Sequence, residues 1–294
     1  MTMPAFRSSL STLASLTLAA GFAGTAGAAV SNVDPEQQRG PDDFVLKTDF
    51  LSKQVDRGVV RNDDTVGHLS ATGRWGFIDS PGTKQGLGAH FDAFFALGED
   101  QSQNPKTSPF ECTELNFKVD YLYEALDASD TPLFQIIPHY EFVTYPNVNE
   151  KQNYLKYRQN WAGIDAWYML PWEGIEIGGG TDWNLNSDAH LFAAAVGARE
   201  FYQDAPFDLA TWQLINFGNR AYKKYFGATN DKSGFTTLDI GGKVTLPLPW
   251  NEFWTYFQAQ AIYWVDGQDR KVLHAAGVDV GDFIIGIGVE WRPE

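Results

Sequence analysis

The chain has 294 residues, with 22 basic and 37 acidic side chains and a formal net charge of −15. This negative charge argues against nucleic acid and anionic lipid headgroups as binding partners. The mean hydropathy is −0.29, and beyond the N-terminus no apolar run approaches the roughly 20 residues of a membrane-spanning helix. The single cysteine, Cys112, excludes an intrachain disulfide.

The N-terminal segment has the pattern of a secretory signal peptide. Arg7 is the first charged residue, an apolar stretch follows it, and Ala26-Gly27-Ala28 matches the small-residue cleavage site. We therefore expect residues 1–28 to be removed after export. Residues 29–42 are polar and contain two prolines, and we interpret them as a periplasmic lead-in. The remaining residues, 43–294, are predicted to form one domain.

Hydrophobic and polar residues alternate with period two through most of this domain, which is typical of β-strands. In chain order, the predicted strands are Phe44–Val55, Val66–Phe77, Leu87–Leu97, Leu115–Tyr123, Phe134–Thr144, Asn160–Leu170, Ile175–Trp183, Ala189–Phe201, Leu209–Phe217, Leu238–Leu246, Phe253–Val265 and Phe283–Trp291. Pro138 lies within the fifth strand and suggests a β-bulge there.

The connections between these twelve strands alternate in length. Short turns marked by proline follow the even-numbered strands, as in Asp79-Ser80-Pro81-Gly82 and Pro171-Trp172-Glu173-Gly174. Longer polar connections follow the third, fifth, ninth and eleventh strands, whereas the connection after the seventh, 184–188, is short. Short periplasmic turns opposite long extracellular loops are typical of outer-membrane barrels. The pattern predicts an all-β, antiparallel, up-and-down transmembrane β-barrel of about 12 strands. A soluble β-sandwich or jelly roll is the alternative.

In such a barrel one face of each strand contacts lipid and the other lines the interior. The second face carries charges of both signs, which we expect to be paired or hydrated. The candidate lumen-lining residues, which would set any ion selectivity, are Arg74, His90, Asp92, Lys118, Asp120, His139, Glu141, Asp165, Asp239 and Lys243. Lys47, Asp49, Glu176, Asp182 and Glu290 fall on the same face.

Three functions remain open for this barrel. A hydrated interior would make it a narrow porin or channel for small hydrophilic solutes, weakly selective because acidic groups outnumber basic ones. An interior filled by paired charges would make it a non-conducting structural or adhesive barrel that acts through its loops. An integral membrane hydrolase would need a serine or threonine near His139 and Glu141.

Motifs for other chemistry are weak. Gly178-Gly179-Gly180 lies within a strand pattern and is not followed by a helix, so it does not indicate nucleotide binding. His68, His90 and His139 are spread over different strands and are interpreted as hydrogen-bond partners rather than metal ligands. We expect no catalytic residues, metal or cofactor. The segment 221–225 is a basic and aromatic cluster in a predicted loop, which could contact lipopolysaccharide phosphates or remain solvated.

The segment Asp49–Val59, an aromatic strand that runs into Arg57-Gly58, resembles the opening of small porin-type outer-membrane barrels. The resemblance implies a transport or structural role in the outer membrane. It implies outer-membrane lipid, lipopolysaccharide, the barrel-assembly machinery and small solutes as partners. The C-terminus departs from that class, whose last strand ends on an aromatic residue, because Trp291 is followed by Arg292-Pro293-Glu294.

Overall fold

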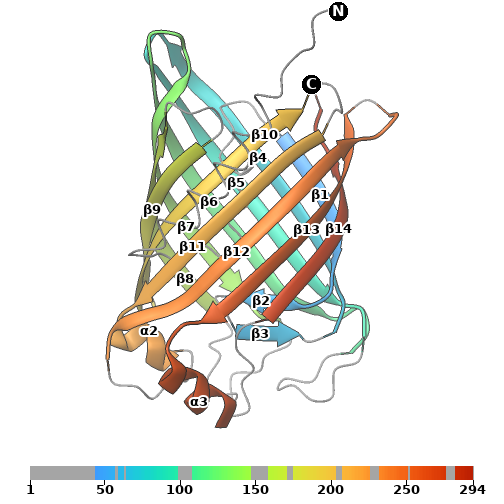
Figure 1. Cartoon of the computed structure of the whole chain (residues 1–294), viewed down its shortest axis with the longest axis vertical. Coiled ribbons are helices and arrows are strands. Elements are labelled where there is room, and N and C mark those ends of the chain that lie inside the picture. Colours follow the sequence, from blue (N-terminus) through green and yellow to red (C-terminus); the bar gives the residue numbers. More distant parts are fainter. Residues whose placement is uncertain are drawn as a thin grey trace, which may run out of the picture.

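The fold comes from a computed structural model and is a closed antiparallel β-barrel of twelve strands (Figure 1). The residues that the structure describes are 44–56, 59–62, 64–98, 108–146, 158–170, 175–202, 207–225, 232–250, 252–275 and 282–293. The predicted signal peptide and lead-in, 1–28 and 29–42, lie outside them. None of the helices in this part of the chain is long and apolar enough to cross a membrane.

The barrel strands follow the chain around the wall, each paired with its sequence neighbours. Their bounds are β1 Phe44–Leu51, β4 Val66–Ser80, β5 Thr83–Ala96, β6 Cys112–Leu126, β7 Pro132–Thr144, β8 Arg158–Met169, β9 Ile175–Asn184, β10 His190–Tyr202, β11 Phe207–Gly218, β12 Gly234–Pro247, β13 Phe253–Trp264 and β14 Asp282–Trp291. The barrel closes where β1 pairs with β14, with Lys47 opposite Glu290. Every backbone donor and acceptor of a spanning strand can then find a partner, which hydrocarbon requires.

Each predicted strand overlaps one barrel strand, so the fold class and the strand number are confirmed. The first prediction extended too far. The strand β1 ends at Leu51, and Gln54 begins a separate small sheet made of β2 (Gln54–Asp56) and β3 (Val59–Asn62). The period-two pattern did not reveal this break because Lys53 continues the polar face of Lys47 and Asp49, although the chain turns away from the wall at this point. The Arg57-Gly58 turn lies outside the described residues.

The bulge predicted at Pro138 is wrong. Strands β6 and β7 keep one register on both sides of it, with Asp120 opposite His139 and Tyr123 opposite Ile136. The pairing is interrupted between these two pairs and then resumes. Proline removes one N–H donor from the ladder, and here the strand tolerates that loss without an inserted residue.

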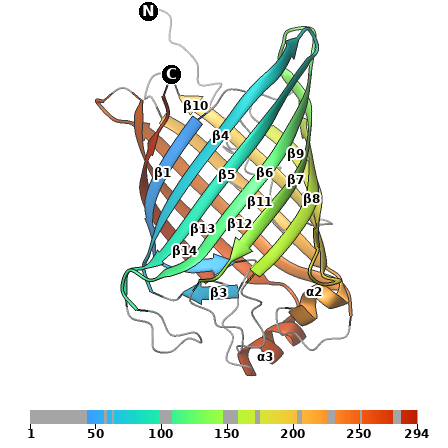
Figure 2. The same cartoon turned by 180° about the vertical axis from the view of Figure 1, so that it is seen from behind.

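Short turns lie at one end of the barrel and long connections at the other (Figures 1 and 2). The β4–β5 turn is only Pro81-Gly82, with Gly82 at φ +84°, a backbone conformation that favours glycine. At the opposite end lie β2, β3 and two short helices, α2 (Arg220–Tyr225) and α3 (Gly267–Ala275). The strand pattern did not predict these helices, which are too short to show a helical period.

The outer face of the wall is apolar. Ile164, Ile240 and Ile285 are exposed in the middle part of their strands. Large aromatic side chains are exposed toward both ends: Trp75 and Trp250 near the short turns, and Phe110, Trp183 and Tyr263 near the long connections. An apolar band between two aromatic girdles is the surface of a barrel in lipid, and a soluble sandwich would not expose it.

Ile240→Arg tests whether the centre of this band contacts lipid. We expect the substitution to lower the free energy of unfolding by about 2–4 kcal/mol, because arginine is costly at the bilayer midplane. Urea titration of the protein folded in phospholipid vesicles measures this loss. Leu246→Arg is the control, since it lies on the same face of β12 close to a short turn and should lose about 1 kcal/mol or less. Equal losses of unfolding free energy at the two positions would contradict the placement of Ile240 at the bilayer midplane.

Candidate functional site: the inner wall of the barrel

The ten predicted lumen-lining side chains all lie on the inner face of the wall. Six of them are buried: Arg74, His90, Asp120, Asp165, Asp239 and Lys243. The other four, Asp92, Lys118, His139 and Glu141, are partly buried. The strand registers bring several of them side by side, because His90 pairs with Lys118 and Lys118 pairs with Glu141. Their role in selectivity stays a prediction.

Asp120 is the centre of the first polar network. Its two carboxylate oxygens accept hydrogen bonds from Arg74 Nη2 at 2.8 and 3.0 Å. His90 Nε2 also contacts Asp120 Oδ2, and Thr72 Oγ1 lies 3.3 Å from His90 Nδ1. The arginine therefore compensates the buried carboxylate directly, as a buried ion pair requires.

His139 lies between two carboxylates from neighbouring strands. Its Nε2 is 2.8 Å from Asp182 Oδ1, and its Nδ1 is 3.3 Å from Asp165 Oδ2. Two glycines make room for this arrangement. A Cβ on Gly163 would collide with Asp182, and one on Gly180 would collide with Asp165. The glycine-rich segment of β9 thus has a packing role, and it does not form a phosphate loop.

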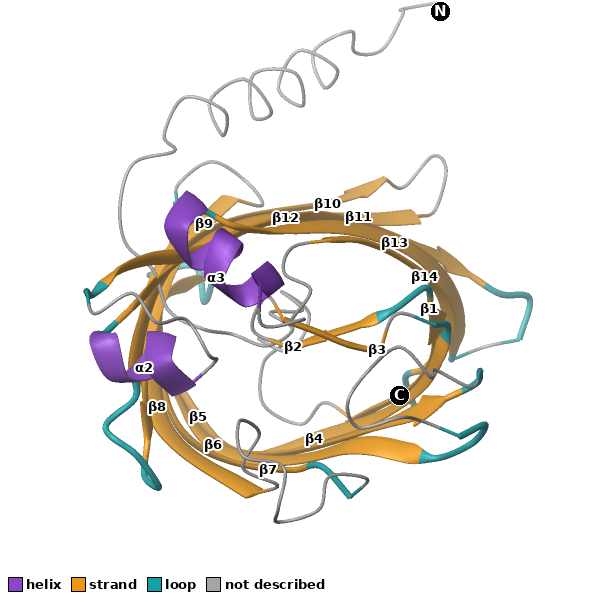
Figure 3. Ribbon diagram, turned by 90° about the horizontal axis from the view of Figure 1, so that it is seen from below, coloured by secondary structure: helices purple, strands orange, loops and turns teal. Residues whose placement is uncertain are grey.

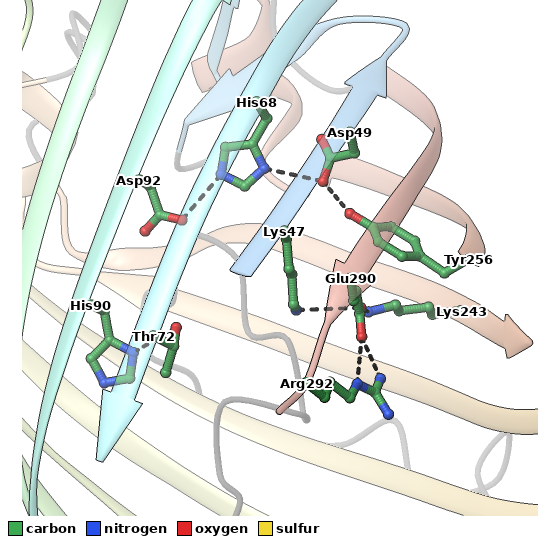
Figure 4. A network of polar contacts seen from close by, with 10 residues as sticks. All are labelled: Lys47, Asp49, His68, Thr72, His90, Asp92, Lys243, Tyr256, Glu290 and Arg292. Carbon is green, nitrogen blue, oxygen red and sulfur yellow. Dashed lines mark hydrogen bonds and ion pairs between the residues drawn. The ribbon is translucent and has the colours of Figure 1, made fainter. Parts of the chain in front are cut away.

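A second histidine has the same surroundings. His68 Nδ1 is 3.2 Å from Asp49 Oδ2, and its Nε2 is 3.0 Å from Asp92 Oδ1 (Figure 4). The Tyr256 hydroxyl donates to Asp49, and the His68 ring stacks on Phe94 with centroids 4.4 Å apart. An imidazole can donate from both nitrogens only when it is protonated on both. The two bridges therefore suit positively charged histidines.

Glu290 holds the seam where the barrel closes. It is fully buried and contacts Lys243 Nζ, Lys47 Nζ at 3.8 Å and Arg292 Nε at 2.8 Å (Figure 4). Lys47 lies on β1, Lys243 on β12 and Glu290 on β14. The contacts consequently join strands from both ends of the chain.

Two inner-wall carboxyls contact amides instead of cations. Asp239 Oδ2 accepts from Gln260 Nε2 at 2.6 Å, and Glu124 Oε2 accepts from Gln135 Nε2 at 2.5 Å. Asp239 Oδ1 has no hydrogen-bond partner in the described part of the chain. These two carboxyls are therefore stabilised by neutral donors.

The interior also contains apolar clusters that the sequence analysis did not identify. Leu122, Ile137, Trp167, Ala193 and Leu214 pack together along one side of the wall. A second cluster consists of Leu51, Val66, Phe94, Ile262 and Ile284. The alternation of faces along β6 places Leu122 on the same face as Lys118 and Asp120. It was missed because this face was expected to be polar.

The arrangement gives little support to catalysis. The contacts of the His139 ring in the described structure are Asp165, Asp182 and the Ile137 carbonyl oxygen, so the hydroxyl that a hydrolase would need is not among them. At His90, Thr72 is near, but Asp120 is already bound by Arg74. Within the described residues, no three His, Cys, Asp or Glu side chains are grouped to hold a metal ion.

The loop segment 221–225 differs from both of its predicted environments. Tyr222 and Lys223 are buried, whereas Lys224 is exposed. Lys223 forms an ion pair with Asp269, with Nζ 2.5 Å from Oδ2. The side chains at 222 and 223 are therefore enclosed by the molecule, and contact of this segment with lipopolysaccharide stays a prediction for the exposed Lys224.

Comparison with known proteins gives structural similarity alone. No family model matches the chain, and no curated protein matches it. Among solved structures, an outer-membrane channel from Pseudomonas putida F1 aligns with a TM-score of 0.55 at 9% identity, covering 90% of this chain and 100% of that one. The KdgM porin aligns with a TM-score of 0.45 at 6% identity, covering 85% and 99%. The NanC porin gives 0.46 at 9% identity, covering 84% and 98%.

The fold is thus that of a twelve-stranded outer-membrane barrel, and the first of these similarities spans the whole of the Pseudomonas channel. At 9% identity the similarity establishes the architecture. The function must be argued from the inner wall itself.

The His139 bridge offers a test of the inner wall. His139→Leu should lower the free energy of unfolding by about 3–5 kcal/mol, because it leaves Asp165 and Asp182 facing each other without the cation between them. Urea titration in vesicles measures the loss. The triple variant that also carries Asp165→Asn and Asp182→Asn is the control, and it should recover much of the stability. If the triple variant is no more stable than His139→Leu, the bridge is not held by charge.

Proposed function

We propose that the protein is a narrow outer-membrane channel for small hydrophilic solutes with a preference for cations. The observation that carries the proposal is the contrast between an apolar outer face and a charged inner wall with an acidic excess. The acidic inner-wall residues are Asp49, Asp92, Glu114, Asp120, Glu124, Glu141, Asp165, Glu176, Asp182, Asp208, Asp239 and Glu290. The basic ones are Lys47, Arg74, Lys84, Lys118 and Lys243, with His68, His90 and His139.

An acidic wall attracts cations and repels anions, and low-dielectric surroundings strengthen both effects. Protonation of His68 and His139, each of which lies between two carboxylates, would reduce this excess without removing it. Carboxylates at partly exposed positions, such as Asp92 and Glu141, would affect a passing ion most. The fully buried Glu290 would act mainly on stability.

The outer-membrane location is part of the same proposal, with export through the N-terminal leader. Trp291 is the last residue of β14, and we propose that the barrel-assembly machinery recognises it as the terminal aromatic. Its indole Nε1 donates to Glu252 Oε2 at 2.8 Å, and its ring contacts Phe44 edge-on with centroids 5.9 Å apart. Contact of the outer face with membrane lipid, and of the loops with lipopolysaccharide, belongs to this proposal too.

A non-conducting barrel is the second candidate, favoured by the apolar clusters and by the tight inner-wall ion pairs. Fully buried side chains such as Leu122 and Trp161 reduce the width open to solutes. Twelve strands fall between the small barrels that side chains fill and the large ones that leave an aqueous channel. Strand number alone therefore does not decide between the two candidates.

Single-channel recording of the refolded protein in a planar bilayer separates them. Discrete conductance steps with a reversal potential that favours cations in a salt gradient would support the channel. A folded and inserted barrel without steps would support the non-conducting alternative. Folding is checked independently by the heat-dependent change of mobility in gel electrophoresis.

Charge variants then test the origin of selectivity. Asp92→Asn and Glu141→Gln should each lower the cation-to-anion permeability ratio, and Lys118→Gln should raise it, by about twofold each. Asp130→Asn is the matched control, because Asp130 is exposed in the short turn between β6 and β7. A ratio that changes as much with Asp130→Asn as with Asp92→Asn would assign the selectivity to the net charge instead of the wall.

A further inference from the structure

Two short helices from different long connections meet at one end of the barrel. The helix α2 follows β11, and α3 follows β13. Seen along the barrel axis, α3 extends from the wall near β9 toward the middle of the barrel end, where β2 and β3 also lie, and α2 lies beside β8 (Figure 3). The first turn of α3 is capped by Asp266 Oδ1, which accepts from the Gln268 backbone N–H at 2.8 Å. Its position is therefore fixed by local hydrogen bonds as well as by packing.

The helix α2 is anchored to the wall beneath it. Asn219 Oδ1 accepts from the Tyr222 N–H at 2.7 Å and from the His190 N–H at 3.1 Å, which ties the start of the helix to β10. The Tyr222 ring contacts Trp161 with centroids 6.3 Å apart. Both rings are fully buried, so α2 is packed against the inner wall at this end.

A buried ion pair joins the two helices. Lys223 on α2 and Asp269 on α3 are 1% and 0% exposed, and Lys223 Nζ is 2.5 Å from Asp269 Oδ2. Neither carboxylate oxygen of Asp269 has a hydrogen-bond donor among the described residues. Among the described residues, Lys223 is the cation that forms an ion pair with Asp269, while Asp266 is a more exposed second partner for the lysine at 3.6 Å. Leu273, one turn after Asp269, is fully buried as well.

We propose that α2 and α3 form a lid over the long-connection end of the barrel, and that the Lys223–Asp269 ion pair holds the lid closed. A buried carboxylate that loses its partner charge is destabilised until it regains water or binds a proton. The two helices belong to separate connections, so α3 can supply that water by moving away from the barrel end. The lid regulates access of solutes to the interior and in this respect rests on the proposed channel function.

Removing one charge and removing both charges have opposite expected effects. Lys223→Met leaves Asp269 buried without compensation and should open the lid. The double variant with Lys223→Met and Asp269→Leu replaces the ion pair with two apolar side chains of comparable size, which are often as stable as a buried ion pair. The double variant should therefore keep the lid closed. Lys224→Met is the matched control, because Lys224 is the exposed neighbour on the same helix.

Thiol labelling measures the lid without relying on conduction. Leu273→Cys is introduced in a Cys112→Ser background, and its reaction with a maleimide is followed in the folded, membrane-inserted protein. The thiol should react slowly in this parent and about tenfold or more faster with Lys223→Met, because the closed state has lost its compensating charge. Lys224→Met and the double variant should label at the parent rate. An unchanged rate with Lys223→Met, or rapid labelling of the parent, would overturn the proposal.

Single-channel recording of the same variants distinguishes the lid from the channel. Lys223→Met should lengthen the open times or raise the conductance, and the double variant should restore the original behaviour. Faster labelling of Lys223→Met with no conductance in any variant would leave the lid in place and reject the channel function. Conductance in all variants with equal labelling rates would reject the lid and leave the channel function in place.

Discussion

Every feature of this molecule depends on the closure of its sheet. In hydrocarbon an unpaired backbone N–H or C=O costs several kcal/mol, so a spanning sheet must have no free edge. Strands β1 and β14, the first and last of the barrel, meet that requirement by pairing with each other. The side chains of the seam reinforce the same contact, since Lys47 and Lys243 both reach Glu290. The backbone pairing that closes the barrel and the ion pairs of Glu290 therefore lie at the same seam, where the first and last strands meet.

Closure also separates the two faces of each strand into different solvents. The outer positions are apolar because they contact lipid tails, and aromatic side chains collect where the tails give way to headgroups. The inner positions are enclosed, so each charge there needs a partner or water. Gly163 and Gly180 show how the wall accommodates this need. They leave space beside Asp165 and Asp182, and those carboxylates can approach His139.

The sequence was sufficient for the strands because their period-two pattern is imposed at every position by these two environments. It located Arg74, Asp120 and His139 on the inner face for the same reason. It did not reveal which side chains contact each other. His139 and Asp182, for example, are 43 positions apart, and their hydrogen bond depends on how the strands between them are paired. Tyr256 lies on the same face of β13 as Gln258 and Gln260, but its contact with Asp49 depends on the closure of the barrel, because the two residues are 207 positions apart in the chain. The helices α2 and α3 gave no signal, since their buried residues are few and their partners lie in other connections.

The inner wall has a division of roles that follows from exposure. Fully buried groups such as Glu290 contact several cations and stabilise the barrel, so their charge is largely cancelled before it can act on a solute. Partly exposed groups such as Asp92 and Glu141 retain a field that a hydrated ion can sense, because water still reaches them. Nine of the twelve inner-wall carboxylates are buried, whereas Asp92, Glu141 and Glu176 are only partly buried. Any preference for cations therefore depends on these three groups and on the partly buried lysines of the same wall, and not on the total acidic charge of the wall.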